Sequence, residues 1–331
     1  MLSFIIRRLA LALFTIWAIS VLAFVIIQLP PVDFIDTYIT SRMSMGGAQM
    51  TPEQIQGLRA QYGADQPKPV QYLRWISLVA RGDFGFTLEY QRPVTEVIGD
   101  RLALTMVVSL AALVVTWVVA LPIGIYSAMH QYSPGDYVFT LLGFLGLAIP
   151  GFLLGLLVLY FGFALFNVNL TGLFSPEFAD APWSMDKFLD MLRHLPVPAL
   201  ILGTAGMAQA MRIMRANLLD EIRKPYVVTA RAKGLSETRA ILRYPVRVAL
   251  NPFASTIGYT LPYIVSGSII VSLVLGLPTV GPLLLKALVA TDLFLAGAIV
   301  LLLGVMTVIG TFLSDLLLMW IDPRIRAGGR R

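Results

Sequence analysis

Residues 9–29 read LALALFTIWAISVLAFVIIQL, a run of 21 residues without a charged side chain. A helix of about 20 apolar residues is long enough to cross the hydrocarbon core of a bilayer. Because Arg7 and Arg8 precede the run, a secretory signal peptide is the alternative, but signal peptides have a shorter apolar stretch of about 7–15 residues. We therefore expect an uncleaved membrane-spanning helix within residues 1–30.

The rest of the chain repeats this apolar pattern. Of its 331 residues, 57% are hydrophobic and 13% are charged, whereas an ordinary soluble domain has about 25% charged residues. The sequence predicts an all-α polytopic membrane protein with six transmembrane helices. Gly203 and Gly206 predict close helix packing in the fourth span, and Pro262 predicts a kink in the fifth that either lines a pathway or is purely structural. The further apolar runs lie at about residues 102–129, 137–166, 196–214, 251–277 and 293–321.

The distribution of basic residues predicts the orientation. Six spans place both termini on one side of the membrane, and Lys and Arg gather on the inner side. If the termini are inside, the inner segments hold 15 Lys and Arg against five acidic residues, and the remainder holds 10 against 14. This distribution predicts an N-in/C-in topology. The net charge of +6 then reflects topology and requires no nucleic-acid partner.

Several kinds of chemistry are missing from the sequence. The chain has no Cys, which excludes disulfides and thiolate metal sites, and His130 and His194 form no metal-ligand pattern. It contains no G-x-x-x-x-G-K-[ST] phosphate loop, no H-E-x-x-H and no G-x-S-x-G motif. We therefore expect no enzyme activity, metal or cofactor on this chain. A self-sufficient secondary transporter is an alternative hypothesis, in which Asp315 in the last apolar run would be the ionisable residue to examine.

An external segment, residues 31–97, separates the first two apolar runs. Thr51, Pro52 and Gln54 predict the start of a helix with a capping box. A second helix is expected at about residues 70–80, where Trp75 is typical of a helix lying at the headgroup level. The segment is either a packed cap on the helix bundle or a docking surface for an external partner, and amphipathicity alone does not separate these alternatives.

Residues 226–252, YVVTARAKGLSETRAILRYPVRVALNP, combine small and basic residues on the predicted inner side. The pattern predicts a helix from Asn217 to Ala232, a break at Gly234, a second helix capped by Ser236, and an end at Pro245. Contact with anionic lipid is one interpretation of the charge. A rigid two-helix projection that fits a groove in a soluble partner is the other. The basic residues are Arg231, Lys233, Arg239, Arg243 and Arg247.

This segment resembles the cytoplasmic coupling motif of ABC-importer permeases, and it is most similar to the dipeptide/oligopeptide permease family, in which YVxTARAKGLS recurs. The Glu of the general motif is missing here, as is usual in that branch. Residues 62–88, 276–288 and 313–326 also resemble family patterns, so the resemblance covers nearly the whole chain. Residues 30–33 depart from the usual Pro-Gly-Asp-Pro. The matching loop residues are Tyr226, Val227, Thr229, Ala230, Arg231, Ala232, Lys233, Gly234, Leu235 and Ser236.

The resemblance implies a type I ABC importer permease fold in the bacterial inner membrane. It implies a first transmembrane helix at residues 1–30, the external segment at 31–97, a five-helix core at 98–321 with a coupling loop at 215–250, and a basic tail at 322–331. Tyr226 and residues 229–236 would contact the ATPase, and Ala230 and Gly234 would act by being small. Substrate-binding residues are not assigned.

The resemblance also implies partners and a transport reaction. The expected partners are a second homologous permease subunit, two cytoplasmic ABC ATPases that bind ATP and Mg, an external substrate-binding protein, and membrane lipid. The expected function is import of di- or oligopeptides or peptide-like compounds by alternating access. Nickel complexes, opines and oligosaccharides are the alternative substrates.

Overall fold

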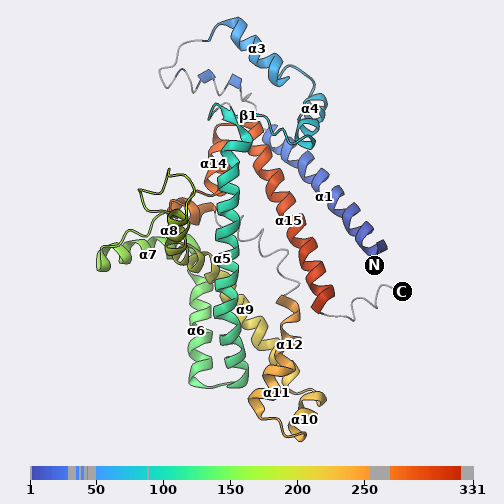
Figure 1. Cartoon of the computed structure of the whole chain (residues 1–331), viewed down its shortest axis with the longest axis vertical. Coiled ribbons are helices and arrows are strands. Elements are labelled where there is room, and N and C mark those ends of the chain that lie inside the picture. Colours follow the sequence, from blue (N-terminus) through green and yellow to red (C-terminus); the bar gives the residue numbers. More distant parts are fainter. Residues whose placement is uncertain are drawn as a thin grey trace. The chain divides into compact units, whose positions relative to one another are not determined.

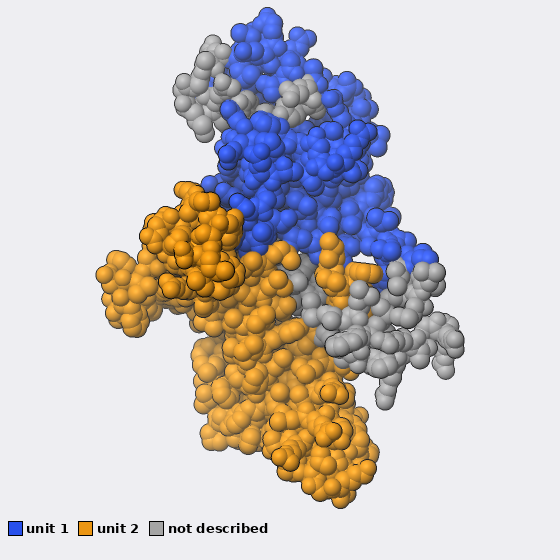
Figure 2. Space-filling view, viewed as in Figure 1, with its two compact units in different colours: residues 1–104, 279–308 blue, residues 105–278, 309–331 orange. Residues whose placement is uncertain are grey.

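The computed structural model describes residues 2–28, 35–36, 39–40, 43, 50–87, 89–253 and 269–321. Long helices dominate this part of the chain (Figure 1). The chain divides into two compact units, the first made of residues 1–104 and 279–308 and the second of residues 105–278 and 309–331 (Figure 2).

In the described residues of the first unit, helices stand on both sides of a short hairpin, and a pair of helices ends the unit. The two strands pair antiparallel, with Phe86 opposite Pro93 and Thr87 opposite Arg92. The elements are α1 (Leu2–Gln28), α3 (Pro52–Tyr62), α4 (Lys68–Ala80), β1 (Phe86–Thr87), β2 (Arg92–Pro93), the start of α5 (Val94–Met129), α14 (Val280–Val289) and most of α15 (Leu293–Ile321).

The core of the first unit forms where α4 packs on α1 and the start of α15. Trp75 on α4 is buried beside Phe24 of α1, with ring centroids 6.2 Å apart, and the Tyr72 hydroxyl lies 2.9 Å from that of Ser20. A Cβ on Gly304 would lie 3.0 Å from Ile19, so glycine allows α15 to approach α1 closely. Large apolar side chains and one hydrogen bond between hydroxyl groups therefore fix α4 to the unit.

The helices between residues 50 and 80 agree in part with the prediction. The capping box is confirmed, since Gln54 N–H donates to the Thr51 hydroxyl and Thr51 N–H donates to the Gln54 side chain. The second helix begins at Lys68, two residues earlier than expected. Its Trp75 is only 3% exposed. The indole therefore packs inside the unit and does not face a membrane surface, and the position of this helix at the headgroup level stays a prediction.

The second unit is built around helix α9, which packs against α5, α6 and α7. Its apolar side chains Met214 and Leu218 are fully buried. A Cβ on Gly203 would lie 2.8 Å from the Thr116 hydroxyl of α5, which confirms the predicted close packing at this glycine. The elements are the rest of α5, α6 (Pro134–Ala148), α7 (Gly151–Phe166), α8 (Met185–His194), α9 (Pro196–Ile222), α10 (Pro225–Ala232), α11 (Glu237–Arg243) and α12 (Pro245–Ala249).

The predicted third span, residues 137–166, is not one straight helix. Helices α6 and α7 meet at Ile149 and Pro150 with a bend of 102°. Ile149 has ψ of 118°, outside the helical region. Proline disfavours the helical conformation of the residue before it and offers no N–H to continue the ladder. The prediction of an apolar segment at residues 137–166 is therefore confirmed, whereas the prediction of one uninterrupted span is not, because of the break at Pro150.

Four described helices are long and apolar enough to cross a membrane, and the bent pair α6 and α7 raises the number to as many as five. Most of the predicted fifth span, including Pro262, lies outside the described residues, as does the tail at 322–331. The chain is thus a mostly helical, multi-pass membrane protein. The four single spans are Ile6–Val25, Val94–Met129, Pro196–Ile222 and Phe294–Asp315.

Candidate functional site

The candidate site is the group of three short helices that follows α9, namely α10, α11 and α12 (Figure 1). The predicted continuous helix from Asn217 to Ala232 is wrong. Helix α9 ends at Ile222, and α10 begins at Pro225 after Lys224, which has an extended backbone with ψ of 148°. Pro225 stands in the first turn, where a missing N–H costs nothing, and it forces the residue before it out of the helical region.

The turn between α10 and α11 depends on Gly234. Its φ is +86°, and its N–H donates to the Arg231 carbonyl at 2.9 Å. A Cβ at this position would meet no atom within 4 Å. Space therefore does not require glycine here; the left-handed backbone does, because β-carbon sterics disfavour it in other residues. The predicted break at Gly234 is confirmed.

Helix α11 begins as expected, but without the expected side-chain cap. Ser236 stands at the N-cap position with ψ of 151°, and its carbonyl accepts from Ala240 N–H. Its hydroxyl makes no capping hydrogen bond. Helix α11 ends at Arg243, and Pro245 begins α12 two residues later. The predicted end of the second helix at Pro245 is therefore confirmed. The two short helices and their tight turn are thus confirmed, whereas the capping role of Ser236 is wrong.

A small apolar core holds the short helices together. Val227 of α10 and Ala240 of α11 are fully buried, and Ile241 is 2% exposed. Ala230 is also buried within the chain, and its carbonyl accepts from Leu235 N–H across the turn. Its small size therefore serves internal packing. The role of Ala230 in contact with an ATPase stays a prediction, and its side chain itself is covered within the chain.

Two polar contacts tie the exposed side of this loop together. Arg231 forms an ion pair with Glu237 across the turn. The Tyr226 hydroxyl donates to the Glu221 carboxylate at the end of α9. Burial, and then this hydrogen bond, raise the pKa of Tyr226, so its hydroxyl remains a donor at neutral pH. Neither pair was found from the sequence, because separations of five and six residues fit no single-helix spacing rule.

The outer surface of the loop combines exposed apolar, small and basic groups. Val228 is 56% exposed and Leu242 is 51% exposed. Of the predicted site residues, Ala230 is buried and Arg231 and Leu235 are half-buried. The exposed ones are Tyr226, Thr229, Ala232, Lys233, Gly234 and Ser236. Arg239, Arg243 and Arg247 are also exposed, and the Arg243 guanidinium lies 5.9 Å from the Tyr244 ring centroid.

This arrangement presents a surface suited to contact with a partner. Among the described residues, no group of three His, Cys, Asp or Glu side chains could hold a metal ion. The loop instead presents a compact surface whose shape is set by buried side chains and a glycine turn. Together, the apolar helices and this projecting loop define a multi-pass membrane subunit.

Comparison with known proteins gives the family. Residues 120–327 match the binding-protein-dependent transport system inner membrane component family, and residues 1–111 match the N-terminal part of such membrane components. This chain therefore belongs to the binding-protein-dependent transport system inner membrane components. It is a permease subunit of an ABC importer and a multi-pass protein of the inner membrane.

Individual relatives match over nearly the full length. A putative peptide permease protein of Brucella ovis is 36% identical over 328 residues, which cover 98% of this chain and 99% of the relative. The oligopeptide transport system permease protein of Bacillus subtilis is 32% identical, and the dipeptide transport system permease protein of Escherichia coli is 30% identical, with the same coverage. The alignments therefore include both residues 31–97 and the loop after α9.

Proposed function

We propose that this chain imports peptides or peptide-like compounds as one of two transmembrane subunits in an ATP-driven complex. The names of the relatives, which include dipeptide and oligopeptide permeases, support the substrate class. The proposed topology has six spans with both termini inside. The proposed partners are a second homologous permease, two cytoplasmic ATPases that bind ATP and Mg, and an external binding protein.

The observation that carries the coupling role is the built shape of the loop from α10 to α12. Val227, Ala230, Ala240 and Ile241 form its buried interior, while the turn at Gly234 stands exposed. In the proposed mechanism the ATPases close on ATP and move this loop, and the loop moves α9. Alternating access follows when that movement opens the pathway first to one side of the membrane and then to the other.

Co-purification tests the proposed assembly. The tagged subunit, extracted in mild detergent, is expected to bring a second permease chain and ATPases that contain phosphate loops. Transport of solute by this chain alone in liposomes without ATP would overturn the proposal. In that outcome the secondary-transporter hypothesis, with half-buried Asp315, would take its place.

Substitution of Gly234 tests the coupling role. Gly234→Trp is expected to insert and assemble normally, yet to lose peptide uptake, because the indole fills the exposed turn that the ATPase contacts. Any residue with a Cβ is strained at φ of +86°, so strain needs its own control. Gly234→Asn provides it, because Asn tolerates the left-handed region and adds little bulk. Uptake is expected to persist in Gly234→Asn, and normal uptake by Gly234→Trp would remove the coupling claim.

A further inference from the structure

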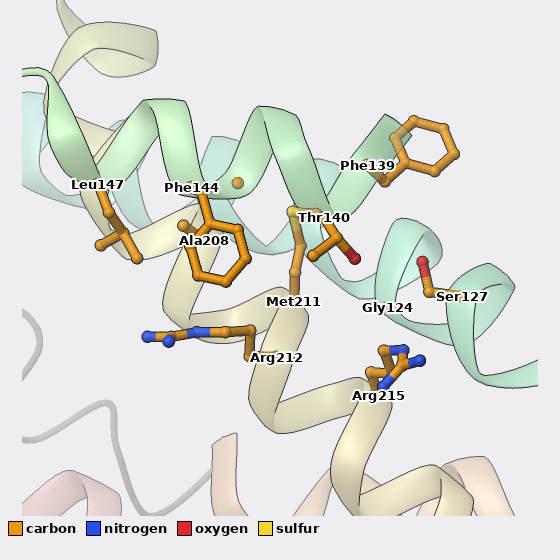
Figure 3. A pocket seen from close by; sticks show the side chains of 11 residues that line it. Gly124, Ser127, Phe139, Thr140, Phe144, Leu147, Ala208, Met211, Arg212 and Arg215 are labelled. Carbon is orange, nitrogen blue, oxygen red and sulfur yellow. The ribbon is translucent and has the colours of Figure 1, made fainter. Parts of the chain in front are cut away.

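A groove lies among α5, α6 and α9 of the second unit. Of its two basic residues, one has a carboxylate partner and the other has none among the described residues. The groove is partly open to its surroundings, and its cavity volume is about 30 Å³. In Figure 3, Phe144 and Leu147 extend from α6 toward α9, and Arg212 runs beneath them. The lining residues are Gly124, Ser127, Phe139, Thr140, Gly143, Phe144, Leu147, Ala208, Met211, Arg212 and Arg215.

The two arginines are three residues apart on α9 and differ in their surroundings. Arg215 donates from Nε and Nη2 to the two carboxylate oxygens of Asp136, at 3.1 and 2.9 Å. The Asp136 side chain is only 4% exposed, so this pair is built into the unit. Arg212 is exposed, and in the part of the chain that the structure describes no carboxylate pairs with it.

The position of Arg212 makes an unpaired charge costly. It lies ten residues before the end of α9, which is a candidate membrane span, or about 15 Å along the helix axis at 1.5 Å per residue. In the proposed topology this position is the inner end of the fourth span, where a cation beside apolar side chains is unfavourable unless its long side chain reaches the headgroup level or meets an anion. Arg215 has its anion in Asp136. Arg212 has none among the described residues, so an anion for it would come from outside them.

We propose that the groove binds an anionic phospholipid of the inner leaflet, with the lipid phosphate on Arg212 and part of an acyl chain along Phe144, Leu147 and Met211. Basic pockets between transmembrane helices on the cytoplasmic side bind anionic headgroups. A planar guanidinium donates two parallel hydrogen bonds to phosphate oxygens. The apolar wall beside Arg212 excludes water, which strengthens that contact.

The inference takes from the proposed function that the C-terminal end of α9 is at the inner surface. Its test does not measure transport. Failure of lipid binding would therefore leave the coupling loop untouched, and loss of coupling in Gly234→Trp would not remove the lipid. A single lipid in this groove would also hold α6 against α9, which is the helix that leads into the loop.

Native mass spectrometry of the purified complex provides the test. Phosphatidylglycerol and phosphatidylcholine with identical acyl chains are added to the wild type, Arg212→Gln and Arg212→Lys. We expect the wild type to retain at least one more phosphatidylglycerol than Arg212→Gln, and phosphatidylcholine to bind both equally. Arg212→Lys keeps the charge and is expected to recover part of the retention. Arg223→Gln removes an equal charge from an exposed position just after α9 and is expected to behave as wild type.

A second variant tests the groove itself. A Cβ on Gly143 would make ordinary contacts of 3.7 Å with Met211 and 3.8 Å with Ala208, so Gly143→Ala is expected to fold and to keep its lipid. Gly143→Leu is expected to fill the groove and lose the lipid. Equal phosphatidylglycerol retention by the wild type and Arg212→Gln would overturn the proposal. Displacement of the lipid by an equal concentration of inorganic phosphate would also overturn it, because it would show a simple anion site.

Discussion

Helix α4 in the first unit and helix α10 in the second are both short, yet they bury different parts of themselves. Helix α4 turns its largest side chain, Trp75, inward and leaves Leu73 63% exposed. Helix α10 buries the small or branched Val227 and Ala230 and leaves Tyr226 at the surface. Helix α4 is therefore fixed by a large buried aromatic side chain, whereas α10 leaves its largest side chain at the surface.

The difference shows how each helix relates to possible partners. Helix α4 is joined to α1 by aromatic packing and by the hydrogen bond between Tyr72 and Ser20, 52 residues apart. The loop around α10 is joined to the unit through its neighbours, since Ile241 of α11 and Val246 of α12 share a buried cluster with Met214 of α9. This supports the packed-cap interpretation for the inner side of α4. It also leaves the surface of α10 available for a partner.

The largest expected effect comes from breaking the attachment of α4. Trp75→Ala removes an almost fully buried indole and is expected to destabilise the first unit by about 3–5 kcal/mol, since the neighbours collapse only partly into the cavity. Thermal unfolding of the purified protein would report this as a lower midpoint. Leu73→Ala on the same helix is the matched control and is expected to change little. Equal midpoints for the two variants would contradict the packing of Trp75.

A second, smaller effect is the pH dependence of folding stability that comes from Asp292, the residue just before α15. Its carboxylate accepts from the buried Thr87 hydroxyl at 2.5 Å and from Leu295 N–H at 3.0 Å. Burial outweighs these hydrogen bonds and raises the pKa of Asp292. The folded state therefore prefers the protonated acid, so the contribution of Asp292 to stability is present at low pH and is lost as the pH rises through the folded pKa.

Measurement of unfolding midpoints between pH 7 and pH 5 would check this sign. The difference in midpoint between wild type and Asp292→Asn is expected to shift in favour of the wild type as the pH falls. Asp190 is the natural contrast. Burial opposes its ionisation as well, but the Ser175 N–H and hydroxyl and nearby His194 outweigh burial and lower its pKa. Its stabilisation is lost only in more acidic solution, so Asp190→Asn is expected to show no such shift over this range.

The smallest expected effect concerns the ion pair of the loop. The Arg231 and Glu237 side chains are 36% and 57% exposed, and exposed pairs contribute about 0–1 kcal/mol. Glu237→Gln is therefore expected to leave the unfolding midpoint nearly unchanged and to lose any salt dependence that the pair supplies. A loss as large as that of Trp75→Ala would show that the loop is held by this pair and not by its buried core.

Local features of the fold were predictable because they depend on neighbouring residues. The capping box at Thr51, the glycine turn at 234 and the helix boundary at Pro245 each follow from side chains within a few positions. The breaks before Pro150 and Pro225 were missed although prolines mark them, because an apolar or helix-forming run was read through the proline. Both errors concern where a helix stops and not whether it forms.

The sequence by itself determined that this protein lies in a membrane, that it is helical and where its loop falls along the chain. The apolar runs show the first two features, and proline and glycine show the third because they act locally on the backbone. Only the tertiary structure decided which polar side chains already have a partner within the chain. Asp136 meets Arg215 from 79 residues away, and Thr87 meets Asp292 from 205 residues away. No local pattern predicts such pairs, because they exist only after separate helices pack and exclude water around them.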